Sequence, residues 1–149
     1  MLALRKCALL AVAVCALAVL TACATYSQDL ERARAHYEAN DFPSALAVLR
    51  LLGEDADALS PTERAEFAYL RGMTDLRIGA TLADERRLER QAFRACARDW
   101  LEVALRSPTA RAPALGPAEA ARARAALAEI YERDGSANDT HPTGACTRP

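Results

Sequence analysis

Arginines recur at every fourth residue in one stretch of the chain: Arg86, Arg90, Arg94 and Arg98, with Arg87 beside the first. On an α-helix this spacing places the side chains in one slowly drifting row. A guanidinium binds carboxylates or phosphates through its planar fork, so the row is suited to carboxylates of a partner protein or to phosphates near a membrane surface. The first four members (Arg86, Arg87, Arg90 and Arg94) are therefore partner-contact candidates. The alternative is an ordinary solvated face, balanced by nearby acidic residues: Glu85, Glu89, Asp99 and Glu102.

Cysteine is the second residue type with chemistry available to it. Two of the five cysteines, Cys7 and Cys15, lie in an apolar N-terminal run, and Cys23 follows that run directly. The remaining two, Cys96 and Cys146, could pair in an oxidising compartment and close a loop of about 50 residues, which would stabilise the fold by roughly 4 kcal/mol. The alternative is a buried Cys96 on a helix and a free thiol at Cys146, because spacing does not determine pairing.

Catalytic motifs are absent from the sequence. It has no glycine-rich phosphate loop, no Gly-x-Ser-x-Gly elbow and no reactive cysteine beside a histidine. The only histidines, His36 and His141, are too few and too far apart for a zinc site. Lys and Arg total 19 against 20 Asp and Glu, so charge does not draw the chain to nucleic acid. We expect a non-enzymatic protein without cofactor or metal.

The N-terminus has the layout of a secretory signal: Arg5 and Lys6 precede an apolar run that ends at Leu20. At about 14 residues, the run is shorter than the roughly 20 that a membrane-spanning helix needs. Its end, Leu20-Thr21-Ala22-Cys23, resembles the lipobox of bacterial lipoproteins. That resemblance implies removal of residues 1–22 by cleavage between Ala22 and Cys23, and acylation of Cys23. Because Asp after the cysteine is the usual inner-membrane retention signal in that family, Ala24 implies an outer-membrane anchor with the domain facing the periplasm.

Beyond residue 25 the sequence predicts an all-α domain, since no stretch has the alternation and composition of a strand. Ser60-Pro61-Thr62-Glu63 is the clearest helix start, with a capping serine, proline at the first helical position and glutamate three residues after the cap. Glycines after apolar runs, Gly53 and Gly79, are expected to end helices. The expected helices are 26–39, 44–52, 61–79, 81–106 and 117–133, and the expected disordered tail is 136–149.

Small residues inside three of these helices indicate a repeat. Ala33, Gly72 and Ala128 each precede a turn-forming residue (Asn40, Gly79 and Gly135) by seven positions. Together with the segments 40–46 and 127–131, this pattern resembles the tetratricopeptide repeat, in which paired helices stack into a superhelix. The resemblance implies hairpins at 26–53 and 61–106 and a capping helix at 117–133, within a domain covering 23–135. An unrelated helical bundle is the alternative.

The chain departs from that family at several positions. Arg32 and Arg71 stand where the family has a large apolar residue, and Asp75 where it has an aromatic one. Against a family period of about 34, the second unit holds about 13 extra residues between Gly79 and Ala97. If these residues lengthen the fourth helix, its first turns project from the body and carry Arg86, Arg87 and Arg90 outward.

Together these features predict a lipoprotein that acts as a protein-protein interaction scaffold or assembly factor in the cell envelope. Its partners would be envelope proteins, and its contact with the membrane would be the lipid anchor. The alternative is a compact helical pilotin-like chaperone for a secretin or other outer-membrane complex, for which a disulfide and one tight bundle are expected.

Overall fold

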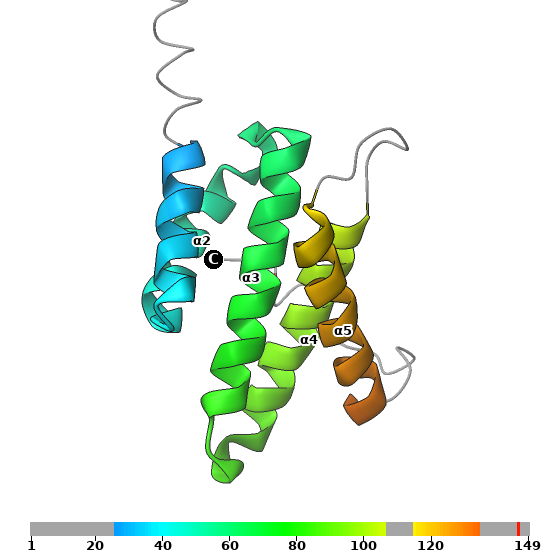
Figure 1. The fold of residues 1–149 in the computed structure, drawn as a ribbon. Helices are drawn as coiled ribbons and strands as arrows, with labels where there is room; N and C mark the ends of the chain where they lie inside the picture. The colour runs from blue at the N-terminus through cyan, green and yellow to red at the C-terminus, as the bar shows by residue number, and fades with distance from the viewer. Residues whose placement is uncertain (1–25, 107–114, 135–145, 147–149) are drawn as a thin grey trace, which may run out of the picture.

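Five α-helices make up most of residues 26–106 and 115–134, which together with Cys146 are the residues described by the computed structural model (Figure 1). The first helix covers 26–38. The others are α2 (Phe42–Glu54), α3 (Pro61–Thr81), α4 (Arg87–Leu105) and α5 (Pro117–Asp134), with short 3₁₀ turns η1 (Ala56–Ala58) and η2 (Asp84–Arg86). The described residues contain no strand, so the predicted all-α class is confirmed. The predicted signal peptide, Ala22, Cys23 and nearly all of the predicted tail lie outside the described residues.

Local capping explains where α2 and α3 begin. Ser60 and Glu63 form the predicted capping box: Ser60 Oγ accepts from the Glu63 N–H at 3.3 Å, and Glu63 Oε2 accepts from the Ser60 N–H at 2.9 Å. Asn40 has a positive φ of 60°, which asparagine tolerates and which ends the first hairpin turn. Asp41 then caps α2 by accepting from the Ser44 N–H, so α2 starts at Phe42 rather than at the predicted Ser44.

Three predicted helix boundaries at or near a glycine are wrong: the ends of α2 and α3 and the start of α4. Gly79 does not end α3, which continues to Thr81, because this glycine provides close contact between helices instead. A Cβ atom at Gly79 would lie 3.1 Å from the Cβ of Phe93 on α4. The longer α3 leaves fewer residues for the next helix, and an extended Ala83 separates them, so α4 begins at Arg87 rather than at residue 81. Gly53 is likewise inside α2, which ends one residue later.

The helices form two layers. The first helix, α3 and α5 run in the same direction along one side, while α2 and α4 return behind them (Figure 1). Arg34 of the first helix joins all three members of the front layer: its Nη2 lies 2.7 Å from Glu66 Oε1 on α3, and its Nη1 lies 2.8 Å from Glu119 Oε1 on α5. This network holds the first helix, α3 and α5 beside one another.

The core lies between the two layers, where Leu30, Leu49, Phe67, Leu70 and Leu101 are almost completely buried. Close packing of α3 on α4 depends on Gly72, as the sequence predicted for small residues at helix crossings. A Cβ at Gly72 would lie 2.7 Å from Leu101 Cγ and 3.0 Å from the Ala97 carbonyl oxygen, so any side chain there would force the helices apart.

The first turn of α4 does not contribute to the core. Leu88 is 81 % exposed, because it lies in that turn at the projecting end of the α3–α4 hairpin. Buried contacts of this helix come from Ala97, Leu101 and Ala104. Within the described residues, no helix combines the length and the apolar character needed to cross a membrane.

Candidate functional site

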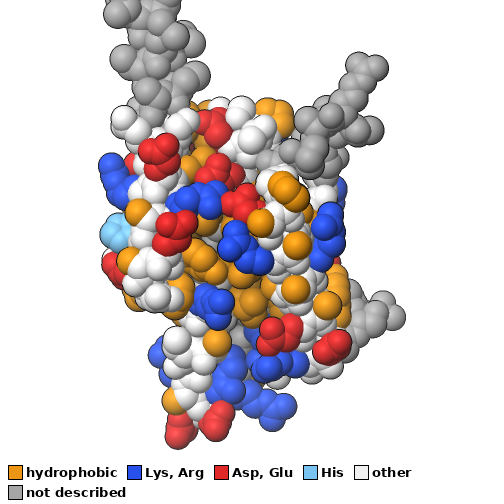
Figure 2. Space-filling view, viewed as in Figure 1, with side chains coloured by type: hydrophobic (Ala, Val, Ile, Leu, Met, Phe, Trp, Pro, Cys, Tyr) orange, Lys and Arg blue, Asp and Glu red, His pale blue; other side chains and the backbone are white. Residues whose placement is uncertain are grey.

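A hollow of about 220 Å³ opens between the later turns of α3, the early turns of α4 and the end of α5. Four arginines dominate its lining, and we call it the arginine pocket. Its lining residues are Leu76, Arg77, Gly79, Ala80, Arg90, Arg94, Glu129, Ile130 and Arg133. Figure 2 shows basic side chains gathered at this end of the molecule. The α3–α4 hairpin and the end of α5 thus bring positive charge to one place.

Helical spacing places the side chains in the pocket. Arg90 and Arg94 are four residues apart on α4, and Glu129 and Arg133 are four apart on α5, so each pair lies on one face of its helix. The close approach of α3 and α4 at Gly79 brings the backbone of Arg90 within 3.5 Å of a Cβ built at that glycine. Consequently the guanidinium groups of α4 enter the space beside α3 instead of pointing into solvent.

Three of the four arginines, Arg90, Arg94 and Arg133, form ion pairs with carboxylates. Arg94 donates from Nε and Nη2 to the two carboxylate oxygens of Asp134, at 2.9 and 2.8 Å, and so fastens the end of α5 to α4. Arg133 Nη2 lies 3.0 Å from Glu129 Oε1. In both Arg94 and Arg133 the guanidinium is therefore already engaged by a carboxylate.

Arg77 and Arg90 keep binding capacity. Arg90 donates from Nη2 to Asp84 Oδ1 at 2.8 Å, but its Nε is buried and no acceptor in the described residues reaches it. Arg77 is exposed and forms no ion pair with any described residue. Arg90 is 25 % exposed and uses only Nη2 in its ion pair, so its Nη1 N–H groups are left for a ligand oxygen.

The predicted arginine row does not act as a single surface. The end of the α3–α4 hairpin does project beyond the first helix and α2 (Figure 1), and Arg86 and Arg87 are exposed there. Arg86 forms an ion pair with Glu89. Arg90 and Arg94, however, are only 25 % and 18 % exposed, because they turn toward α3 and α5. The expectation that Arg90 is carried outward with the projecting turns is therefore wrong.

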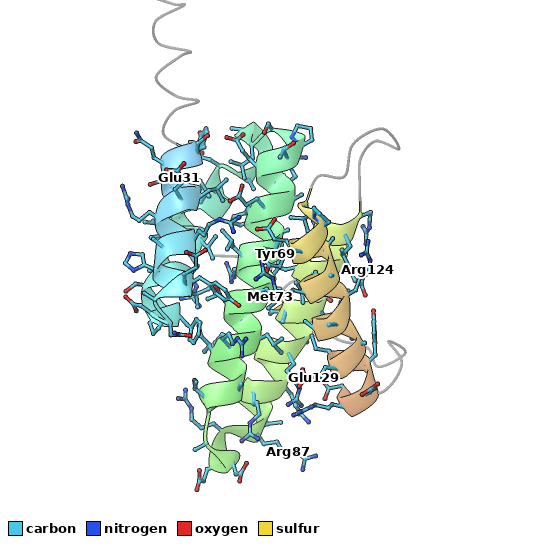
Figure 3. All side chains as sticks on the ribbon, in the orientation of Figure 1. Glu31, Tyr69, Met73, Arg87, Arg124 and Glu129 are labelled. Atoms are coloured by element: carbon cyan, nitrogen blue, oxygen red, sulfur yellow. A yellow bond between two sulfur atoms is a disulfide. The ribbon has the colours of Figure 1, made fainter. Side chains whose placement is uncertain are left out.

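The pocket has two arginines that the sequence analysis missed, Arg77 and Arg133. Neither belongs to a regular row, and they come from α3 and α5. Figure 3 shows Glu129 on α5 beside the pocket and Arg87 near the hairpin end, whereas Arg124 lies on the outer side of α5.

A second hollow, about 480 Å³ and largely apolar, lies on the other side of α3; its lining residues are Asn40, Phe42, Pro43, Leu46, Ala47, Arg50, Ile78, Thr81 and Phe93.

The cysteine alternatives are distinguished by the structure, which joins Cys96 of α4 to Cys146 in a disulfide with a Cα–Cα distance of 5.1 Å. This distance is within the range of ordinary disulfides. Cys146 is buried, so the free and exposed thiol that formed the alternative is absent from the structure. The bond fastens the only described residue of the C-terminal segment to the middle of α4.

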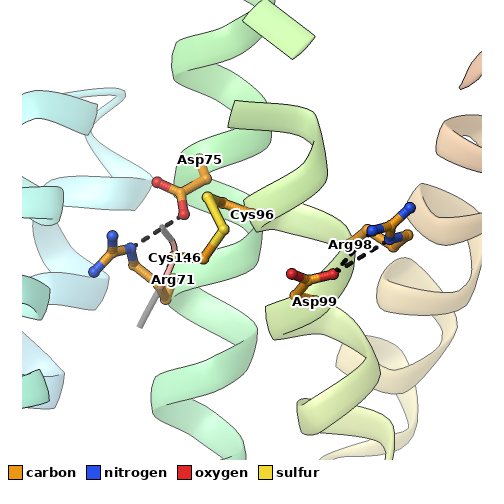
Figure 4. The surroundings of a disulfide bond; sticks show 6 residues. All are labelled: Arg71, Asp75, Cys96, Arg98, Asp99 and Cys146. Atoms are coloured by element: carbon orange, nitrogen blue, oxygen red, sulfur yellow. Dashed lines mark hydrogen bonds and ion pairs between the residues drawn. A yellow bond between two sulfur atoms is a disulfide. The ribbon is translucent and has the colours of Figure 1, made fainter. Parts of the chain in front are cut away.

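A buried ion pair lies beside the disulfide (Figure 4). Arg71 Nε donates to Asp75 Oδ2 at 3.1 Å, and the side chain of Asp75 is only 2 % exposed. The guanidinium of Arg71 also lies over the ring of Trp100, 5.8 Å from its centroid, and Trp100 contacts Phe67 edge to face. Trp100 is thus a packing residue, as expected from its place in the apolar stripe.

Burial makes Asp75 sensitive to pH. Desolvation raises the pKa of this carboxyl to about 6, and the opposing effect of Arg71 does not cancel it. A pKa raised by folding adds stability at low pH and loses it as the pH rises through about 6. We therefore expect the free energy of unfolding to be roughly 1 kcal/mol higher at pH 5.0 than at pH 7.5. Urea denaturation at the two pH values measures the difference.

The control for this prediction is Asp75→Asn, which should remove most of the increase. The carboxyls whose pKa values are lowered, Asp41 and Glu63, affect stability only below about pH 4.5, outside the window used. Equal pH dependence in the wild-type protein and in Asp75→Asn would contradict the assignment.

The described residues contain no cluster of three or more His, Cys, Asp or Glu side chains that could hold a metal ion. No protein-family model, curated protein or solved structure matches the chain. The arginine pocket, the disulfide and the buried ion pair are consequently the features from which function has to be inferred.

Proposed function

We propose that this chain is a lipid-anchored protein of the bacterial cell envelope that holds a partner protein at the periplasmic face of the outer membrane. The proposed anchor is the acylated Cys23, three residues before the first helix. A diacylglycerol group on the thiol and a fatty acid on the new amino group would hold the protein firmly, since each buried methylene contributes about 0.8 kcal/mol. The folded residues would then serve as a binding module.

The observation that carries this proposal is the position of the arginine pocket. The first helix begins at the end of the molecule where α3 begins, as the hydrogen bond from Ser27 to Glu63 indicates. The arginine pocket lies at the opposite end, where α3 ends and α5 ends (Figures 1 and 2). A chain anchored at Cys23 would hold the end with residue 26 toward the membrane and direct the pocket toward periplasmic proteins.

A photocrosslinking experiment in living cells tests the proposal. A photoreactive amino acid replaces Ala80, an exposed alanine of the pocket lining, or Ala128, an exposed alanine of α5. Ala128 lies about 160° around the helix from Ile130 and serves as the matched control. We expect one discrete protein adduct from Ala80, recovered with the outer membrane, and none from Ala128. Identical patterns from the two positions, or recovery of the protein in the soluble fraction, would overturn the proposal.

The second candidate is an escort protein of the pilotin kind, and the Cys96–Cys146 disulfide favours it. A bond that ties the C-terminal segment to α4 suits a closed bundle better than an open stack. The same experiment separates the candidates. After synthesis of the partner is stopped, an adduct with a scaffold persists, whereas an adduct with an escort disappears as the partner completes its assembly.

A further inference from the structure

We infer that the arginine pocket is a carboxylate-binding site that takes an acidic side chain of a partner peptide. This inference rests on the proposed function, because it names the chemistry of the partner. It is drawn from the charges, the size and the apolar lining of the pocket.

The charge balance favours a ligand with one negative charge. Four guanidiniums line the pocket, and three carboxylates lie within ion-pair distance of them: Asp84, Glu129 and Asp134. One positive charge is left over within the described residues. A single carboxylate would neutralise it, whereas a phosphate group carrying nearly two charges would meet repulsion from the Glu129 carboxylate.

Arg77 and Arg90 still have N–H donors for a ligand, and their positions define how a carboxylate would bind. Arg90 is 25 % exposed and uses only Nη2 in its ion pair with Asp84, and Arg77 from α3 has no ion-pair partner in the described residues. Both line the same hollow. A carboxylate has two oxygens and accepts hydrogen bonds from two donors at once, so one oxygen can accept from each guanidinium.

The dimensions and the lining fit one side chain. A volume of about 220 Å³ is below the roughly 300–1,000 Å³ of sites that enclose a whole small molecule. Leu76, Ala80 and Ile130 supply an apolar wall beside the guanidiniums. An aspartate or a glutamate combines a carboxylate with an aliphatic stem, and so matches both parts of the lining.

Peptide binding to the full-length mature lipoprotein in non-ionic detergent micelles tests this inference. The probe is a rhodamine-labelled peptide with four glutamates, compared with the same peptide carrying four glutamines. We expect the glutamate peptide to bind at least tenfold more tightly, and Arg77→Gln and Arg90→Gln each to weaken it by about tenfold, the effect of losing one charge-assisted hydrogen bond.

The matched control is Arg124→Gln, which removes the same charge from the outer side of α5 (Figure 3) and should leave binding within twofold of wild type. Arg77 is exposed, so its substitution should leave the thermal unfolding midpoint unchanged. Equal weakening by Arg124→Gln and Arg77→Gln would show a general charge effect and overturn the inference. Displacement of the peptide by inorganic phosphate at lower concentration than by acetate would also overturn it.

The scaffold function and the carboxylate site can be overturned independently of each other. A discrete Ala80 adduct in cells without preference for the glutamate peptide would remove the carboxylate assignment and leave the scaffold in place. Specific peptide binding without any adduct in cells would remove the scaffold function and leave the carboxylate site as a property of the pocket.

Discussion

Replacing Cys96 and Cys146 together by serine is expected to lower the free energy of unfolding by about 4 kcal/mol. The disulfide closes a loop of 50 residues, and the linked unfolded chain has correspondingly less conformational freedom. The double variant regains that freedom when it unfolds, so its folded state is less favoured. The loop contains the second half of α4 and all of α5, so the side of the arginine pocket that α5 provides depends on the same bond.

Urea denaturation of the full chain measures this effect, with the reduced wild-type protein as the matched control. The double variant and the reduced wild type should unfold at the same urea concentration, well below the unreduced wild type. A thiol reagent should label neither Cys96 nor Cys146 in the unreduced protein. Labelling of both, or coincident unfolding curves for the unreduced wild type and the double variant, would contradict the disulfide.

Arg71→Met is expected to destabilise the fold by roughly 3–5 kcal/mol, because it leaves the Asp75 carboxylate buried without its partner. The side chain of Asp75 is 2 % exposed, so water cannot replace the lost guanidinium. Removing both charges should be much less harmful. We therefore expect Arg71→Met combined with Asp75→Leu to recover most of the loss, since an apolar pair of similar size avoids the desolvation penalty.

Arg32→Met is the matched control for this cycle. Arg32 forms an ion pair with Asp29 on the first helix, but its side chain is 60 % exposed, so its loss should cost less than about 1 kcal/mol. Denaturation of the wild type, Arg71→Met, Asp75→Leu and the double variant gives the coupling energy between Arg71 and Asp75. An effect of Arg71→Met as small as that of Arg32→Met would contradict the account of the buried pair.

The sequence predicted the number and the order of the helices well because their start signals are local. The capping box at Ser60 needs only four consecutive residues, and the small residue at Gly72 marks a close helix contact through its own size. Boundaries at Gly79 and Arg87 were wrong because a glycine has two uses. Periodicity alone does not distinguish a glycine that ends a helix from one that lets a neighbouring helix approach.

The departures from the repeat pattern have a physical explanation. Arg71 and Asp75 both stand where the tetratricopeptide family has apolar or aromatic residues, and the structure pairs them with each other in the interior. Each residue alone contradicts the pattern, while together they replace two packing side chains by an ion pair. The four-residue spacing contained this information, but it became interpretable only with the burial of α3.

The sequence analysis identified only two of the four arginines in the candidate site. Arg90 and Arg94 belong to a regular row and were singled out, whereas Arg77 and Arg133 stand alone in α3 and α5. Their meeting depends on the packing of three helices whose contributing residues span more than fifty positions. Such a contact is set by tertiary structure, and helical periodicity describes each helix separately.

The central claim is that a lipid anchor at Cys23 tethers this helical binding module to the outer membrane. Mass spectrometry of the intact protein, isolated from cells of a bacterium with an outer membrane, tests it most directly. The account predicts a chain that begins at Cys23 and carries the mass of a diacylglycerol group and an amide-linked fatty acid. A chain that retains Met1 and has no acyl mass would contradict it.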